Sequence, residues 1–537
     1  MGAVNSATGG TYLGAAEASY TLSGFVQYDW HVSHTLTVNI GLRYDYQQPP
    51  YERDCGSSNF NPTAINPQTH LPGEMQYACK DYGNTFLKPE YTDFAPRFGF
   101  AWDPTGAGKF MVRGGYAIFF PSTFNVDYFG TLSGFASTIT TYSAPGGNTN
   151  QPAFYLRQGF PTPLIQPLGS ALGPSFLLNS AVTYDQPDQR TPMSQQWSFS
   201  LQKQIRDSWV IDISYSGNRG THLVAGGYAM NQLNPIYDDT LKTALENTVS
   251  NPYYGMVPGA SATITLQQSL LPFPYYTTVS THYPHLGSSI YHSALLRVQK
   301  RLRNGLTFLA SYSKAKLIDD SEASPIDFGS IEQVLNDTYQ NSYDRRQERS
   351  VDPTDIAQRL AISSVYQLPF GAGRHFDAHN RLANAIVGGW QAQTIITLQT
   401  GNPVLITGAN NNLATRPNST GQSALLSNPT QYEWFNTAAF VNPPSYTFGN
   451  VGRALPDVRN PGFFNCDLSV SKNTTIRERL KAQFRVEAFN LDNHVNLGYP
   501  NTAFVAGANG LNSSSTFGTI TSARAPRVIQ LGLKLSF

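Results

Sequence analysis

The sequence predicts an all-β fold, namely an antiparallel β-barrel that spans a membrane. Three observations lead to this prediction. Segments of about nine to twelve residues alternate between apolar and polar side chains, these segments come in pairs joined by short turns, and long polar segments separate the pairs. A strand that crosses a bilayer needs about 9–11 residues, whereas strands of soluble sheets most often have about 5–6.

The first pair shows the pattern clearly. In residues 35–46, TLTVNIGLRYDY, every second residue is apolar and the residues between them are polar or Gly. Residues 22–32 alternate in the same way, and only a short turn separates the two runs. We therefore expect a hairpin.

The same unit recurs to the end of the chain. We expect further strands at 94–102, 110–120, 197–205, 209–216, 293–302, 306–313, 359–370, 389–400, 463–472, 479–490 and 527–537. Asn304-Gly305 between two of them is a strong hairpin-turn signal. The sequence thus predicts about thirteen strands.

The connections between pairs are long and rich in Asn, Gly, Pro, Ser and Thr. They cover residues 47–92, 121–194, 217–290, 314–356, 401–462 and 491–525, and we expect them to be structureless. Short turns at one rim and long loops at the other are typical of outer-membrane barrels, in which the turns are periplasmic and the loops extracellular. A soluble propeller or sandwich is the alternative, but its strands are shorter, and propeller blades repeat at a fixed spacing that is not seen here.

The composition of the 537 residues agrees with a surface that meets lipid. Charged residues make up only 13% and aromatic residues 12%, and the formal net charge is +1. So small a net charge gives no reason to expect a nucleic acid as partner. There is no apolar run of about 18 residues, so a transmembrane helix is not expected. No signal peptide is visible in the first residues either.

Alternation also assigns side chains to the two faces of the barrel wall. Lipid cannot hydrogen-bond to a backbone, so the sheet must close on itself, with an apolar outer face and a polar inner face. Arg43, Asp45, Arg97 and Arg113 fall on the inner face and are candidate ligand contacts, although hydrogen bonding within the wall is the simpler role for each. The aromatic residues expected on the outer face, as interface girdles, are Trp30, Tyr44, Trp102, Phe120, Trp197 and Trp209.

Cys55 and Cys79 lie in one polar segment and could close a loop disulfide in an oxidising compartment, the alternative being two unrelated thiols. Cys466 falls in a strand pattern and is expected to be a small apolar residue.

The charged segment 343–355, YDRRQERSVDPTD, is interpreted as a solvated loop, with contacts to a ligand or to lipid headgroups as the alternative.

The sequence patterns that could indicate catalysis or metal binding are incomplete. GAGK at 106–109 lacks the first Gly and the Ser/Thr of a phosphate loop and is interpreted as a hairpin turn. His31/His34 and His282/His285 have a spacing that can bind zinc, but no acidic or Cys ligand is in register. We therefore expect no enzyme activity, no catalytic residue, no cofactor and no metal.

Several segments resemble a known family. They are YDRRQERSVDPTDIAQRLAISSVYQLPFGAGR, GGWQAQTIITLQTGNPVLIT, NPGFFNCDLSVSKNTTIRERLKAQFRVEAFNLDNHVNLGYPN and FGTITSARAPRVIQLGLKLSF, together with VSHTLTVNIGLRYDYQ near the start. In this order they are similar to the barrel of TonB-dependent outer-membrane receptors of the Oar-like type, found in Acidobacteria-like genomes. Such barrels have about 22 strands around a plugged lumen.

The resemblance implies a location in the bacterial outer membrane and a transport role. Extracellular loops would bind a ligand, and the barrel would pass it across the membrane; the alternatives are a non-transporting adhesin or structural barrel, or a protein-export component. It also implies that the last strand, with Leu533, Leu535 and Phe537, is read by the barrel-assembly machinery. Outer-membrane lipid, an unknown ligand and TonB would be the partners, TonB through a plug.

We further expect residues 1–19 to be a loop remnant and residues 20–537 to be a partial barrel, with the plug, TonB box and signal peptide absent.

Overall fold

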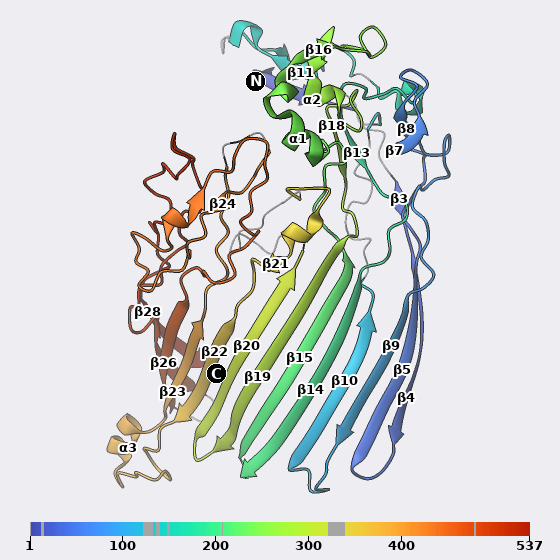
Figure 1. The fold of residues 1–537 in the computed structure, drawn as a ribbon. Coiled ribbons are helices and arrows are strands. Elements are labelled where there is room, and N and C mark those ends of the chain that lie inside the picture. Colours follow the sequence, from blue (N-terminus) through green and yellow to red (C-terminus); the bar gives the residue numbers. More distant parts are fainter. Residues whose placement is uncertain are drawn as a thin grey trace.

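The computed structural model describes residues 2–11, 16–121, 133–135, 140–147, 151–164, 166–206, 208–320, 339–409, 411, 413–476 and 480–537. Its main feature is one antiparallel sheet (Figure 1). Thirteen strands follow one another along this sheet in sequence order, and a short fourteenth, β21 (Ser350–Val351), pairs with β20. The predicted strand number and fold class are confirmed.

The thirteen strands are β4 (Thr21–His31), β5 (Leu36–Gln47), β9 (Phe94–Trp102), β10 (Phe110–Phe119), β14 (Met193–Arg206), β15 (Trp209–Leu223), β19 (Gly287–Arg303), β20 (Leu306–Asp319), β22 (Gln358–Gln367), β23 (Trp390–Gln399), β26 (Phe463–Thr475), β27 (Lys481–Phe489) and β28 (Val528–Ser536). Four of them, β14, β15, β19 and β20, have 14 to 17 residues, more than the nine to twelve expected. Their additional residues lie at the rim where the long connections begin (Figure 1).

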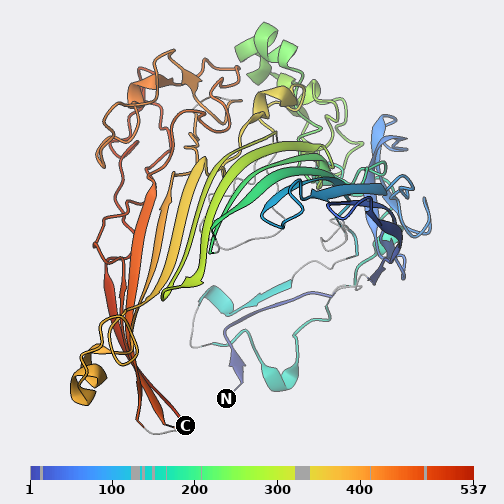
Figure 2. The same ribbon diagram turned by 90° about the horizontal axis from the view of Figure 1, so that it is seen from below.

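The sheet curves like part of a cylinder wall but does not close (Figure 2). Among the described strands, β4 and β28 each pair on one side only. The register keeps one set of alternate residues on the same face from β4 to β28. The cross-strand pairs Val26–Leu42, Ile40–Phe98, Leu201–Ile213, Ile362–Ile396 and Val486–Leu531 lie on the apolar face.

Two compact caps stand on the rim opposite the short turns, where structureless loops were expected (Figure 1). What we call the first cap is built from segments within residues 47–92, 133–194 and 217–286. It contains the strands β7 (Ser58–Ile65), β8 (Pro72–Tyr77), β13 (Ala181–Tyr184), β16 (Thr248–Ser250), β17 (Thr263–Thr265) and β18 (Thr278–Thr281) and the helices α1 (Pro235–Leu241) and α2 (Leu266–Ser269).

The first cap has its own hydrophobic core, which includes Phe60, Tyr77 and Tyr276. The Phe60 ring packs edge-on against Tyr276 with 5.3 Å between the ring centres. Cys55 and Cys79 form a disulfide bond in this cap. The expectation of structureless loops is wrong here, because the scattered aromatic residues of distant segments bury one another.

The second cap is built from segments within residues 401–462 and 491–525, with β24 (Asn418–Ser419) and β25 (Phe440–Val441). Its core is a separate cluster that includes Val404, Phe435, Phe440 and Phe517. The three phenylalanine rings meet edge to face, and the ring centres of Phe435 and Phe517 are 5.1 Å apart. The prediction of a structureless connection is wrong for this cap too.

Short strands complete the described part of the chain: β1 (Ala3–Val4), β2 (Ser6–Gly9), β3 (Glu17–Ala18), β6 (Tyr51–Glu52), β11 (Thr140–Ser143) and β12 (Phe154–Tyr155). In the segment expected as a loop remnant, β1 pairs with β12 and β2 with β11. No helix was expected from the sequence, yet besides α1 and α2 the structure has α3 (Arg381–Val387) between β22 and β23. No described helix has the length and apolar character to cross a bilayer.

Candidate ligand-facing site

The four charged residues expected on the inner face all lie on the polar, concave face of the sheet. Asp45 pairs across the strands with Ser23, Arg43 with Ala95, Arg97 with Gly41, and Arg113 with Ala101. Along each strand, these residues and their partners occupy the positions between the residues of the apolar face. The structure does not gather the four into one group, however.

Arg43 and Asp45 neutralise each other. The Nε of Arg43 donates to Oδ1 and Oδ2 of Asp45 at 2.8 and 2.9 Å, and its Nη2 donates to Ser23 Oγ at 2.9 Å. Arg113 donates from Nη1 to Gln202 Oε1 at 2.8 Å. Each of these three side chains therefore makes hydrogen bonds within the wall, and contact with a ligand stays a prediction for all of them.

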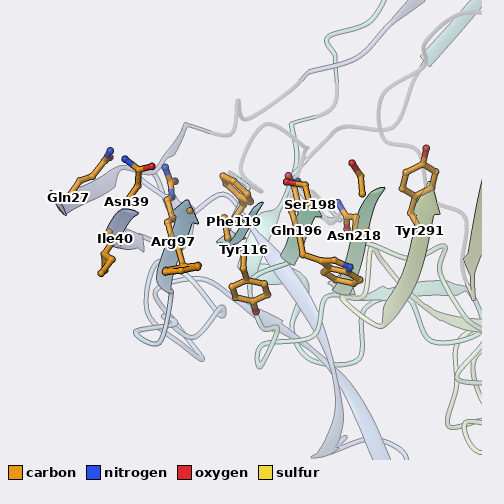
Figure 3. Close-up of a pocket in the computed structure, with 18 residues that line it drawn as sticks. Gln27, Asn39, Ile40, Arg97, Tyr116, Phe119, Gln196, Ser198, Asn218 and Tyr291 are labelled. Carbon is orange, nitrogen blue, oxygen red and sulfur yellow. The ribbon is translucent and has the colours of Figure 1, made fainter. Parts of the chain in front are cut away.

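Arg97 is different, because it borders a trough in the concave face. The trough has a volume of about 620 Å³ and crosses β5, β9, β10, β14 and β15. The guanidinium of Arg97 lies over the ring of Phe119, 5.0 Å from its centre. Figure 3 shows Arg97, Asn39 and Ser198 on one side of the strands and Ile40 on the opposite side.

Small residues form the floor of the trough. A continuous row of cross-strand partners runs through Asn39, Gly99, Gly115, Ser198 and Ser216. Larger polar groups line the neighbouring positions, namely Gln27, Gln196, Asn218 and Tyr291. Because the floor lacks long side chains while amides and a phenol stand beside it, the trough offers many hydrogen-bonding groups and one guanidinium to a ligand or a docked chain.

Sequence reasoning missed the trough residues other than Arg97. Each strand shows its Gly or Ser at a polar-face position, for example in FGFAW at 98–102. These positions align across five strands only because of the register in which the strands pair. Long connections separate several of these strands in the sequence, so the register cannot be read from it. Only the pairing of the strands could have revealed the row.

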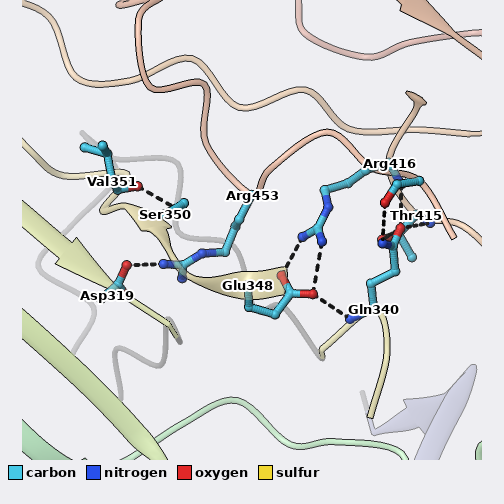
Figure 4. Close-up of polar contacts among 9 residues, drawn as sticks. Asp319, Gln340, Glu348, Ser350, Val351, Thr415, Arg416 and Arg453 are labelled. Atoms are coloured by element: carbon cyan, nitrogen blue, oxygen red, sulfur yellow. Dashed lines mark hydrogen bonds and ion pairs between the residues drawn. The ribbon is translucent and has the colours of Figure 1, made fainter. Parts of the chain in front are cut away.

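Above this wall, buried ion pairs fasten the second cap to the strand ends (Figure 4). Arg416 donates to both carboxylate oxygens of Glu348, at 2.6 and 3.0 Å, and both side chains are buried. Arg453 pairs with Asp319 at the end of β20, and Arg459 with Asp355 at 2.6 Å. The interpretation of 343–355 as a solvated loop is therefore wrong for two of its acids, Glu348 and Asp355, which reach the interior of the cap junction.

The histidine spacings noted in the sequence serve other contacts. His282 Nδ1 lies 2.8 Å from Asp185 Oδ1, and His285 Nδ1 lies 2.6 Å from the carbonyl oxygen of Arg190. Burial lowers the pKa of His285. His31 Nδ1 lies 3.1 Å from Thr37 Oγ1. In the described ranges, no group of three His, Cys, Asp or Glu side chains is arranged to hold a metal ion.

Comparison with known proteins gives one sequence match to a family. The profile of the outer membrane beta barrel domain matches residues 1–530. No curated protein matches the sequence.

Solved structures with a similar fold share little sequence. The outer membrane transporter YddB from Escherichia coli has 10% identity and a TM-score of 0.44 over 97% of this chain and 54% of its own. The ferripyoverdine receptor of Pseudomonas aeruginosa has 10% identity and a TM-score of 0.39 over 96% of this chain and 38% of its own. BauA, the ferric preacinetobactin receptor from Acinetobacter baumannii, has 10% identity and a TM-score of 0.39 over 97% and 43%. The chain thus spans about half the length of these structures or less.

Proposed function

The chain belongs to the outer membrane beta barrel domain family and is located in the bacterial outer membrane, and from this premise we propose that it forms the wall of a TonB-dependent transporter. Residues 20–537 supply the barrel wall, the caps receive a ligand outside the cell, and the concave face passes it inward. TonB acts through a plug, the unit that fills the lumen of such transporters. We assign no catalytic residue and no cofactor.

The observation that carries this proposal is the trough. A wall whose only task was to sit in lipid would not need a floor of small residues below its caps. Here Gly99, Gly115 and Ser198 leave about 620 Å³ open on the concave face, beside the guanidinium of Arg97. Space and hydrogen-bonding groups on the inner face favour passage of a polar molecule or docking of a plug.

The experiment compares the whole protein in its host bacterium with a deletion strain and with Ser198→Trp, which fills the trough. Compounds removed from the growth medium are measured by mass spectrometry, with and without a protonophore. We expect wild-type cells to deplete at least one compound that deletion, the protonophore and Ser198→Trp all spare. Ser313→Trp, on the concave face of β20 outside the trough lining, is the matched control and should leave depletion intact.

The runner-up is a non-transporting adhesin or structural barrel, or an export component of the Oar-like type. If no compound is depleted and deletion instead abolishes attachment of the cells to surfaces, the adhesive function replaces transport. Loss of a secreted protein on deletion would favour export.

A further inference from the structure

The connection between β22 and β23 departs from the other turns of the wall. The hairpins β4–β5, β9–β10 and β19–β20 turn over residues 32–35, 103–109 and 304–305, whereas residues 368–389 join β22 to β23. This connection contains α3 (Arg381–Val387). It lies at the end of the sheet opposite the caps and outside the curve of the wall, on the convex side (Figures 1 and 2).

Two side chains of the apolar face attach the end of α3 to the wall. Trp390 donates from Nε1 to the carbonyl oxygen of Ile386 at 2.9 Å. Lys472 donates from Nζ to the carbonyl oxygens of Ile386 and Gly388 at 2.9 and 2.7 Å. Trp390 and Lys472 are cross-strand partners, and the ammonium lies 5.2 Å from the centre of the indole ring. The carbonyl group of Ile386 in the last turn, and that of Gly388 directly after the helix, thereby have partners on the wall, and these bonds fix the position of the helix outside the wall.

The start of α3 is equally well ordered by hydrogen bonds. The side chain of Asn380 accepts from the backbone N–H groups of Leu382 and Ala383 at 2.9 and 3.1 Å, as an N-cap residue does. Asp377 accepts from the Asn384 side chain at 2.7 Å and from two backbone N–H groups, and these bonds lower the pKa of Asp377 to about 2. A short helix that is held by hydrogen bonds at both ends presents its side chains in fixed directions.

The face that α3 presents is apolar. Leu382 and Ile386, four residues apart and therefore on the same side of the helix, are 77% and 69% exposed. Scattered exposed aliphatic residues are ordinary on protein surfaces. Here, however, two of them adjoin the apolar face of the sheet, at the level of Trp390 and Lys472. A tryptophan with a lysine at this level is typical of the boundary between acyl chains and headgroups.

We propose that α3 is an interfacial anchor whose Leu382–Ile386 face enters the periplasmic leaflet of the outer membrane and binds phospholipid acyl chains. The argument rests on continuity, because the apolar face of the wall that meets lipid runs directly into the exposed face of α3. Arg381, exposed at the first position of the helix, would meet lipid phosphates, as basic residues of membrane-surface helices do.

The test places a spin label on the helix. Leu382→Cys and Ile386→Cys are made in a Cys466→Ala background, because Cys466 is the free thiol and the Cys55–Cys79 disulfide is left intact. The whole protein is inserted into vesicles of phosphatidylethanolamine and phosphatidylglycerol, and collisions of the label with oxygen and with a nickel chelate are measured. His379→Cys, in the turn before the helix with its side chain 88% exposed, is the matched control.

We expect labels at Leu382 and Ile386 to have an oxygen-to-nickel collision ratio severalfold higher than the label at His379. Equal ratios at the three positions would overturn the proposal, since the helix would then lie in water. Labels that neither reagent reaches would also overturn it, because a protein partner would then cover the face.

A second measurement does not depend on reconstitution. In isolated outer membranes, a membrane-impermeant maleimide should modify His379→Cys severalfold faster than Leu382→Cys. Equal rates would contradict the anchor. Heat-dependent mobility on a gel confirms that each variant is folded before either measurement.

Discussion

Replacing Arg416 by Met should release the segment 339–351 from the second cap. The guanidinium of Arg416 and the carboxylate of Glu348 are almost completely buried, with side-chain exposures of 7% and 4%. Two direct hydrogen bonds join them, and Gln340 N–H donates a third to Glu348 at 3.2 Å. Removing only the Arg leaves a carboxylate in the interior without its counter-ion.

The expected magnitude follows from that burial. Breaking a buried ion pair by removing one partner costs about 3–5 kcal/mol, chiefly because the remaining charge stays unpaired. At about 1.4 kcal/mol per factor of ten, local opening should become more frequent by roughly two to three and a half orders of magnitude. Lys88 and Asp188 form the matched surface pair, 2.7 Å apart but 70% and 64% exposed, so Lys88→Met should cost less than about 1 kcal/mol.

Hydrogen exchange of the folded protein, followed by mass spectrometry of peptides, measures the local opening. Peptides covering 339–351 and 413–420 should lose protection in Arg416→Met, while those of the first cap should not. Adding Glu348→Gln removes the unpaired charge and should restore most of the protection. If Arg416→Met behaves like Lys88→Met, or if the double variant is worse than Arg416→Met alone, the buried pair does not hold the junction.

Three further predictions concern the first cap and the wall. Replacing both cysteines of the first-cap disulfide by Ser should lower cap stability by about 3 kcal/mol, because the bond closes a loop with a sequence separation of 24, and faster proteolysis within 47–92 would reveal this. Burial raises the pKa of Asp238 to about 6, above its unfolded value of about 3.9, so its contribution to stability is present below about pH 4 and is lost as the pH rises through 6. The protection of α1, corrected for the intrinsic pH dependence of amide exchange, should therefore fall between about pH 4 and 7 in the wild type but not in Asp238→Asn. A methyl group at Gly217 would collide with the Trp197 indole, so Gly217→Ala should cost about 1–3 kcal/mol and lower the midpoint of heat unfolding, whereas Gly24→Ala, which faces open space, should not; equal midpoints would contradict the close contact.

The wall could be predicted from the sequence because lipid imposes a simple rule on every strand. A residue that faces acyl chains must be apolar and its neighbour faces the other way, so period-two alternation alone gives β5 at 36–47 and β9 at 94–102 almost without error. The rule weakens where strands rise beyond the membrane. This is why β19, which begins at Gly287, was expected to start only at residue 293.

The caps and the trough could not be predicted, for a different physical reason. The core of the first cap joins Phe60 to Tyr276, and the junction of the second cap joins Glu348 to Arg416, across long stretches of chain. Neither contact has a local period. An acid in a charged segment looks the same in the sequence whether water or a buried arginine is its partner, so Glu348 was assigned to solvent.

The way the second cap is fastened limits how the caps can open for a ligand in the proposed transport function. Lifting this cap as one unit would separate Arg453 from Asp319 and Arg459 from Asp355, and would leave several charges unpaired in the interior. Each such separation costs several kcal/mol. When all the ion pairs are broken together, the summed cost exceeds the free energy that the binding of a dilute ligand readily supplies. Entry should therefore involve movement of segments between or beside the caps while the junction stays closed. Locking the junction should then leave transport intact, whereas filling the trough should abolish it.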